Sequence, residues 1–260
     1  MPFCPVPHTP RDQVWLGVGL ATGAFLYSMI RKPVLSIKED RLKTKSFGDS
    51  KVFTLVLTGG PCGGKSTGMT MIKKELELDG YTVYTVPEVP TILISGGCAY
   101  PGENGGELLM EFETGLIALQ MSIEESFLRI AASTGCKSVV IFDRAIMDIP
   151  AYLPAQAWKD VLARNSLTED SLADRYDMVL HMQTAAEGAE PFYTTANNVA
   201  RTETAAQARE LDKRINANWG RCCKHKVEVA TNKGTTFDQK IEKAVKAVKV
   251  NIADYYKTNN

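Results

Sequence analysis

The segment Gly59–Ser66 reads Gly-Gly-Pro-Cys-Gly-Gly-Lys-Ser and constrains the fold of this 260-residue chain more than any other feature. It matches the pattern G-x-x-x-x-G-K-[ST] and stands between an apolar run, Val52–Thr58, and a helix-forming stretch, Lys65–Leu78. In that setting the glycines let backbone N–H groups point inward, towards a phosphate chain at the positive end of the new helix. The sequence therefore predicts a phosphate-binding loop that takes a nucleoside triphosphate.

Several side chains around this loop have expected roles of their own. Lys65 is expected to reach the β- and γ-phosphates as a catalytic residue, and the Ser66 hydroxyl to ligate Mg²⁺. Cys62 lies inside the loop, so alkylation of its thiol should block nucleotide binding. Asn232 follows the last apolar run, where base-contacting loops of such folds lie; an ordinary loop residue is the alternative. The predicted nucleotide-binding residues are Gly59, Gly60, Pro61, Cys62, Gly63, Gly64, Lys65, Ser66, Thr67 and Asn232.

Apolar strands and helix-forming stretches alternate from residue 52 to residue 256. Strands are predicted at 52–58, 81–86, 138–142, 177–182 and 227–230. Helices are predicted at 65–78, 108–132, 155–164, 167–175, 202–219 and 237–256, with a Gly-rich loop at 96–106. This alternation predicts an α/β fold of the P-loop NTPase type, similar to nucleoside and nucleotide kinases. We expect a doubly wound, parallel, five-stranded sheet, with the charged helix 202–219 as a mobile lid.

Charged residues follow two of the predicted strands. Asp143 comes directly after an apolar strand and is expected to hold Mg²⁺ together with Ser66; a helix cap or a surface turn is the alternative. Glu88 ends another strand between two prolines, and is expected to orient an attacking hydroxyl or water, or to support the magnesium ion. Its alternative is a solvated turn residue. Arg144 and Arg201 are expected to neutralise charge on the transferring phosphoryl group.

The bulk charge of the chain argues against a nucleic-acid partner. Lys and Arg number 30, as do Asp and Glu, and no basic run with interleaved aromatic residues occurs. The six cysteines show no C-x-x-C pair and no metal-ligand spacing. A P-loop enzyme is normally intracellular, where thiols stay reduced.

An uncharged stretch precedes the predicted domain. Val14–Ile30 is at the short end for a membrane span, and seven Lys and Arg against three acids follow it between residues 31 and 51. The positive-inside rule then places the domain on the cytoplasmic face of a membrane. We expect a tail at 1–13, a transmembrane anchor at 14–30, a basic linker at 31–51 and the P-loop domain at 52–256. A cleaved targeting peptide and a soluble appendage, with the domain in the cytoplasm, remain as alternatives.

Further motifs cover nearly all of residues 52–255. They are Thr58–Thr67, Val86–Thr91, Gly96-Gly97, Gln120 with Glu124, Asp143-Arg144 with Asp148, Ala151–Leu153, Arg175–Asp177, Gln183–Glu190, Tyr193, Asn198–Thr204, Ala208 and Leu211-Asp212. In order and spacing they resemble the NadR/TRPL-translocation-defect-type P-loop domain family, a kinase-like group sometimes labelled AAA-type ATPase. Ala145 departs from this pattern, since a glycine is expected there. The segment Arg221–Lys224 also departs from it, because it replaces a Gly-His-Pro-like turn. The family's contacts to the nucleotide base therefore do not carry over to this segment.

The resemblance implies a nucleoside-kinase-like core that binds ATP or GTP, with Arg201 heading the lid and Glu88 and Asp143 facing the phosphates. In the animal branch it also implies phosphoinositide binding and a trafficking role. We therefore expect Mg²⁺-dependent phosphoryl transfer to an unidentified small acceptor or to water. A nucleotide-dependent module that binds phosphoinositides or a partner, and a pseudoenzyme, are the alternatives. The absence of an N-K-x-D motif favours ATP over GTP.

The membrane alternative also draws on lysines of the last predicted helix. These are Lys240, Lys243, Lys246 and Lys249, whose spacing would suit an anionic phospholipid surface. A solvated polar face is the other interpretation of the same row.

Overall fold

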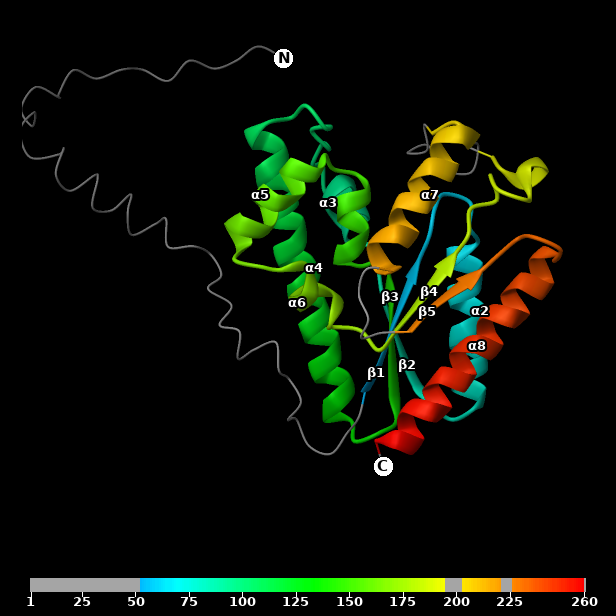
Figure 1. Ribbon diagram of the computed structural model, residues 1–260. Coiled ribbons are helices and arrows are strands. Elements are labelled where there is room, and N and C mark those ends of the chain that lie inside the picture. The colour runs from blue at the N-terminus through cyan, green and yellow to red at the C-terminus, as the bar shows by residue number, and fades with distance from the viewer. Residues whose placement is uncertain (1–51, 195–202, 221–225, 260) are drawn as a thin grey trace, which may run out of the picture. The chain divides into compact units, whose positions relative to one another are not determined.

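The computed structural model describes residues 52–194, 203–220 and 226–259, which Figure 1 draws in colour. The predicted tail, anchor and linker at residues 1–51 lie outside these ranges, as do Arg201 and the turn at 221–224. Within the described ranges, no helix has the length and apolar character needed to cross a membrane.

Five parallel strands form a single sheet in the order β2-β3-β1-β4-β5. They are β1 (Val52–Thr58), β2 (Thr82–Val86), β3 (Ser138–Asp143), β4 (Met178–Met182) and β5 (Lys226–Ala230). The central strand β1 pairs Leu57 with Asp143 of β3, and Thr58 with His181 of β4. The predicted α/β fold with a parallel, five-stranded sheet is confirmed.

Helices cover both faces of the sheet, as expected for a doubly wound fold (Figure 1). On one face α2 (Lys65–Leu78) and α8 (Phe237–Thr258) pack side by side over Leu55 and Leu57 of β1. The other face is covered by α4 (Glu107–Ser133), with α5 (Ala155–Asn165) against it. Alternate residues of each strand point to opposite faces, so a strand buried on both sides must be apolar almost throughout, as β1 and β3 are.

Short elements were harder to predict than long ones. The structure adds α3 (Val89–Ser95) and two short 3₁₀ elements, η2 (Ile146–Ala151) and η3 (Glu190–Phe192). It also shortens the predicted helix 167–175 to α6 (Glu169–Ala173), which Thr168 caps. Elements of three to seven residues complete at most two turns, so a hydrophobic period cannot be recognised in them.

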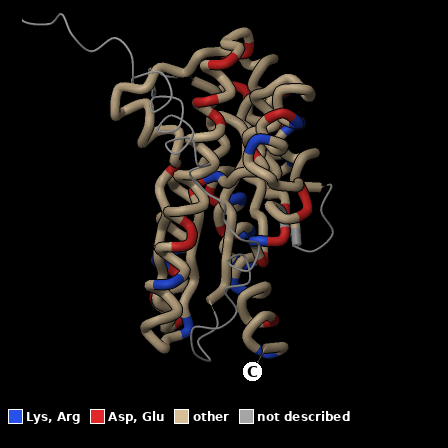
Figure 2. The backbone as a smooth tube through the Cα atoms, turned by 90° about the vertical axis from the view of Figure 1, so that its left-hand side faces the viewer, with Lys and Arg blue, Asp and Glu red and all other residues tan. Residues whose placement is uncertain are grey.

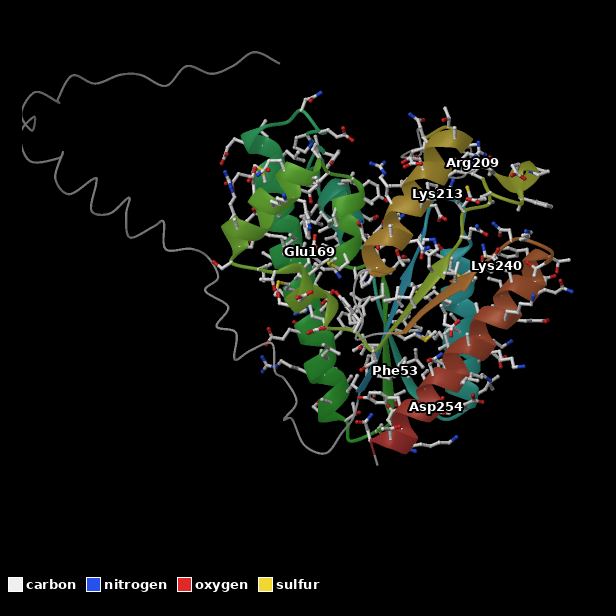
Figure 3. All side chains as sticks on the ribbon, viewed as in Figure 1. Phe53, Glu169, Arg209, Lys213, Lys240 and Asp254 are labelled. Atoms are coloured by element: carbon white, nitrogen blue, oxygen red, sulfur yellow. The ribbon has the colours of Figure 1, made fainter. Side chains whose placement is uncertain are left out.

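The helix predicted as a lid, α7 (Ala205–Gly220), is packed against η2 over the part that the structure describes. Leu211, Ile215 and Trp219 on its inner face are buried, and Arg209, labelled in Figure 3, donates to the carbonyl oxygen of Ala186 at 2.8 Å. In this structure the inner face of α7 is thus packed against the body of the domain. The residues 195–202 that lead towards it lie outside the described ranges.

A buried ion pair accounts for several of the family motif residues. Arg175 donates to Glu124 Oε2 on α4 at 2.9 and 2.6 Å, while Tyr176 and Gln120 donate to Glu124 Oε1 at 2.8 and 2.7 Å. Because every oxygen of this buried carboxylate has charged or polar donors, its burial is compensated. These residues fasten α4 to the start of β4 and take no part in the site described below.

Candidate nucleotide-binding site

The sheet brings the predicted phosphate-site residues to one edge. β2, β3 and β1 are neighbours: Glu88 follows β2, Asp143 is the last residue of β3, and the loop that leads to Lys65 follows β1. The carboxyl ends of parallel strands meet at the same edge, which is where ligands bind in open α/β sheets. Arg144 confirms the juxtaposition, since its Nε lies 2.6 Å from Oε1 of Glu88.

The backbone of the phosphate loop can only be built with glycine at its closest contacts. Gly59 has a φ of +126°, and a side chain on Gly59 or Gly63 would clash with the carbonyl oxygen of Met182 at the end of β4. Gly64, with a φ of +88°, precedes α2. The loop therefore needs glycine for two reasons: to let phosphates approach the backbone, and to avoid clashes and strain at these positions.

Side chains from β4 and α7 hold the loop from beneath. Asp212 Oδ1 accepts hydrogen bonds from the Gly60 N–H at 2.7 Å and the Thr184 N–H at 3.1 Å, and lies 3.1 Å from His181 Nε2. The Thr184 hydroxyl donates to the Pro61 carbonyl at 2.5 Å. Burial raises the pKa of Asp212, but His181 and the two N–H donors lower it more, so the carboxylate stays ionised.

The first turn of α2 is open to an anion. No side chain among the described residues caps it and no acidic residue lies in it, so its first N–H groups remain available to an anion. Lys65 Nζ donates to the carbonyl oxygens of Gly59 and Gly60, both at 2.9 Å. Burial, and then Arg144, lower the pKa of Lys65 to about 7 against the opposing charges of Asp143 and Glu88. A phosphate chain would supply the missing negative charge.

Arg144 is held at the centre of the site. Its φ of +65° is uncommon for a residue with a side chain. Besides the Glu88 pair, its Nη1 lies 3.5 Å from Asp148 Oδ2 and donates to the Gly59 carbonyl at 3.3 Å. Burial raises the pKa of Glu88, but Arg144 and a hydrogen bond from Thr91 outweigh it, so the pKa of Glu88 lies below its usual value.

Asp148 is a functional-site residue that was not singled out from the sequence for a role. It is buried on η2 and accepts hydrogen bonds from the Thr58 hydroxyl at 2.7 Å and from Trp219 Nε1 at 2.6 Å. It thereby joins the end of β1 and the last turn of α7 to Arg144. The signal available was an acidic residue inside the apolar run Ile146–Ile149.

Ser66 and Asp143 carry the oxygen ligands that suit Mg²⁺. The Ser66 residue is exposed at the start of α2, and the Asp143 carboxylate forms no hydrogen bond with the described residues. Burial and then Glu88 raise the pKa of Asp143, which a divalent cation would reverse. Hydroxyl and carboxylate oxygens are the ligands that Mg²⁺ takes, with phosphates and waters completing its shell.

A second buried carboxyl lies on α4. Glu113 is 2% exposed, and its Oε2 has no hydrogen-bond partner among the described residues. Burial raises its pKa to about 7. Glu113 affects the pKa of Tyr100 in the Gly-rich loop, as does Tyr152, whose own pKa responds to Arg144. Electrostatic influence thus links Glu113 through Tyr100 and Tyr152 to Arg144. The sequence signal was an acid on the buried stripe of that helix.

Asn232 has a different environment from the one predicted. It is buried, its Nδ2 donates to the carbonyls of Thr184 at 2.7 Å and Glu187 at 2.9 Å, and its Oδ1 accepts from Lys240 at 2.8 Å. The side-chain amide is thus fully used in holding two loops together. It could contact a nucleotide base only by breaking these bonds.

The four lysines considered from the sequence as a membrane-facing or solvated row do not form one exposed face of α8. Lys240 is buried, and Lys249 pairs with Glu75 at 3.0 Å and Asp79 at 3.1 Å. An α-helix turns about 100° per residue, so a spacing of three drifts by about 60° at each step and does not follow one face. Acidic and basic residues are interspersed along the described chain (Figure 2).

The comparisons with known proteins agree with this site. Residues 54–240 match the sequence model of the AAA domain family. The chain belongs to that family. No curated protein matches the chain.

A solved structure described as the crystal structure of NadR protein in complex with NR matches with a TM-score of 0.53 and 16% sequence identity. The match covers 78% of this chain and 52% of that one, so this chain spans about half the length of the matched NadR chain. At this identity the likeness shows the fold, and it confirms the predicted NadR-type P-loop domain. The protein is a nucleotide-binding P-loop NTPase.

Proposed function

We propose that the protein binds ATP or GTP with Mg²⁺ and transfers the γ-phosphoryl group to a small acceptor molecule. One observation carries the proposal: Lys65 and Arg144 converge beside the open end of α2 with the carboxylates of Glu88 and Asp143. The two cations would neutralise the charge of a triphosphate. The pKa of Glu88 is lowered and that of Asp143 is raised, so the two carboxylates suit two different tasks.

The donor half of the site consists of the phosphate loop and the first turn of α2. Its N–H groups and Lys65 would bind the β- and γ-phosphates. Ser66 and Asp143 would hold Mg²⁺, which neutralises charge on the phosphates when bound. Lys65 would exchange its bonds with the Gly59 and Gly60 carbonyls for bonds with phosphate oxygens.

Arg144 would stabilise the charge that builds up on the transferring group. Glu88, Asp148 and the Gly59 carbonyl hold its guanidinium, so little reorganisation is needed during the reaction. The lowered pKa of Glu88 makes it a weak base. Its role would be to orient Arg144 and the acceptor hydroxyl, which is sufficient because phosphoryl transfer passes through a loose transition state.

The acceptor half would lie towards Glu113, Tyr100 and Tyr152. A buried carboxyl oxygen without a partner is costly, and an acceptor that donates a hydrogen bond to Glu113 would remove that cost. The neighbouring carboxylates, Glu88 and Glu103, would repel an anionic acceptor. The NadR structure contains a ligand termed NR, which supports a small-molecule acceptor for this fold.

The test follows the γ-phosphate. The full chain is incubated with Mg²⁺ and γ-labelled ATP or GTP, with and without a small-metabolite extract. We expect label in a new, extract-dependent compound, none with Lys65→Ala, and unchanged nucleotide affinity but little turnover with Glu88→Gln. Release of label only as free phosphate, or tight binding without turnover, would refute the kinase and favour the nucleotide-dependent binding module.

We also propose that Val14–Ile30 anchors the protein to the cytoplasmic face of a membrane, on the strength of its apolar composition and the basic residues that follow. Alkaline carbonate extraction tests this. The full chain should stay in the membrane pellet, and a chain without residues 14–30 should not. Release of the full chain into the supernatant would contradict the anchor.

A further inference from the structure

Lys240, in the first turn of α8, is a buried lysine in contact with the phosphate loop. It is labelled in Figure 3, is 2% exposed, and has no acidic side chain within hydrogen-bonding distance among the described residues. Its Nζ donates to the carbonyl of Gly63 at 2.9 Å, the carbonyl of Gln183 at 2.6 Å and Oδ1 of Asn232 at 2.8 Å. An ammonium group has three N–H donors, and each of them has an acceptor here.

The acceptors join three separate parts of the nucleotide site. Gly63 belongs to the phosphate loop, Gln183 follows β4, and Asn232 follows β5. Asn232 in turn fastens the segment after β4 through the carbonyls of Thr184 and Glu187. Burial lowers the pKa of Lys240 to about 8, with Asp212 opposing this effect, so a charge at this position is costly. Three well-placed acceptors compensate that cost.

The contact with Gly63 fixes the direction of the next N–H. In a planar trans peptide the carbonyl and the following N–H point in opposite directions. The Gly63 carbonyl points at Lys240 Nζ, so the Gly64 N–H must point away from it, towards the side on which we expect the phosphates. The same rule applies to the peptide between Gly59 and Gly60, whose carbonyl accepts from Lys65 and whose N–H donates to Asp212, so these two side chains lie on opposite sides of it.

We infer that Lys240 is a positioning residue of the phosphate loop, which aims the Gly64 N–H at a bound polyphosphate and ties the loop to the segment after β5. The inference rests on nucleotide binding and not on phosphoryl transfer. Lys240 thereby contributes to phosphate affinity, although it lies 177 positions away from Gly63 in the sequence.

The experiment compares Lys240→Met with Lys243→Met in the full chain, using Mg·ATP and inorganic tripolyphosphate as probes in titration calorimetry. Lys243 is exposed on the same helix and serves as the matched control. We expect Lys240→Met to bind both probes roughly 10- to 100-fold more weakly, the range for losing a hydrogen bond to a charged group. Lys243→Met should bind as the wild type does. The equal loss for both probes identifies the phosphates as the part affected.

A Lys240→Met variant that melts at lower temperature but keeps wild-type affinity would overturn the inference, because packing alone would then explain the residue. If the variant does not fold, the inference is tested on the wild type instead, through the NMR resonances of its backbone amides. The Gly64 N–H resonance should move strongly downfield with tripolyphosphate, and an unmoved resonance would overturn the inference. Failure of the wild type to bind either probe would instead refute nucleotide binding itself.

Discussion

Replacing Glu113 by Gln should stabilise the protein at alkaline pH. The carboxyl is buried and Oε2 has no partner among the described residues, and burial raises its pKa from 4.5 to about 7. The folded state therefore holds this proton more tightly than the unfolded state. Between pH 4.5 and 7 the folded protein binds more protons, so stability falls as the pH rises through this window. Glutamine does not ionise and escapes the loss.

The size of the effect follows from the pKa values. The difference between 4.5 and about 7, at about 1.4 kcal/mol for each pH unit, gives about 3 kcal/mol. At each pH we take the unfolding free energy of Glu113→Gln minus that of the wild type. The predicted quantity is this difference at pH 9 minus the same difference at pH 5. The amide's own cost of burial cancels in this double difference. For a domain of this size, about 3 kcal/mol corresponds to roughly 6–12 °C in Tm.

The assay is urea unfolding at pH 5, 7 and 9, with Glu111→Gln as the control. Glu111 lies on the same helix with its side chain 70% exposed, so its substitution should have little pH-dependent effect. A double difference near zero for Glu113→Gln would refute the reasoning, because the carboxyl would then ionise as it does in water. If Glu113 also binds the acceptor, the stabilised variant should show a higher KM for that acceptor with nucleotide affinity unchanged.

Three further predictions concern the phosphate loop. A bound triphosphate should raise the pKa of Lys65 from about 7. Nucleotide affinity should therefore be full below pH 7 and fall by up to about tenfold for each pH unit above it. Calorimetry between pH 6 and 9 would show this fall, and an affinity that does not change with pH would contradict it. Asp212→Ala leaves the N–H groups of Gly60 and Thr184 without an acceptor, at about 1–3 kcal/mol each, and should lower the unfolding free energy by about 2–6 kcal/mol. Asp212→Asn keeps an acceptor oxygen and should lose less; equal losses in urea unfolding would speak against the hydrogen bonds. Stoichiometric alkylation of Cys62, which is half-buried, should abolish nucleotide binding, whereas full binding after modification would contradict this prediction.

The sequence allowed the sheet and the donor half of the site to be predicted because both depend on local signals. The strand before the loop and α2 were predicted with the bounds that the structure has, Val52–Thr58 and Lys65–Leu78. Asp143 and Glu88 could be chosen because each directly follows an apolar strand, and parallel strands bring such positions to one edge.

The supports of the loop could not be predicted, because their partners are remote in sequence. Asp212 and Thr184 contact residues 152 and 123 positions earlier, and no periodic pattern encodes such a pairing. Glu113 was missed for a related reason: a single acid on a buried stripe looks like any charged residue of a long helix. The membrane-facing interpretation of the four lysines treated a spacing of three as one face of α8, although Lys240 lies on the buried side of that helix.

The supports of the phosphate loop also bear on how the protein is made. The loop is among the earliest parts of the domain to leave the ribosome, yet its contacts come from Thr184, Asp212 and finally Lys240. Its central strand likewise waits for β3 and β4. A nascent chain therefore cannot form a finished cradle until α8 has emerged. Protection of the nascent chain from proteolysis by nucleotide would then mark the emergence of α8 from the ribosome.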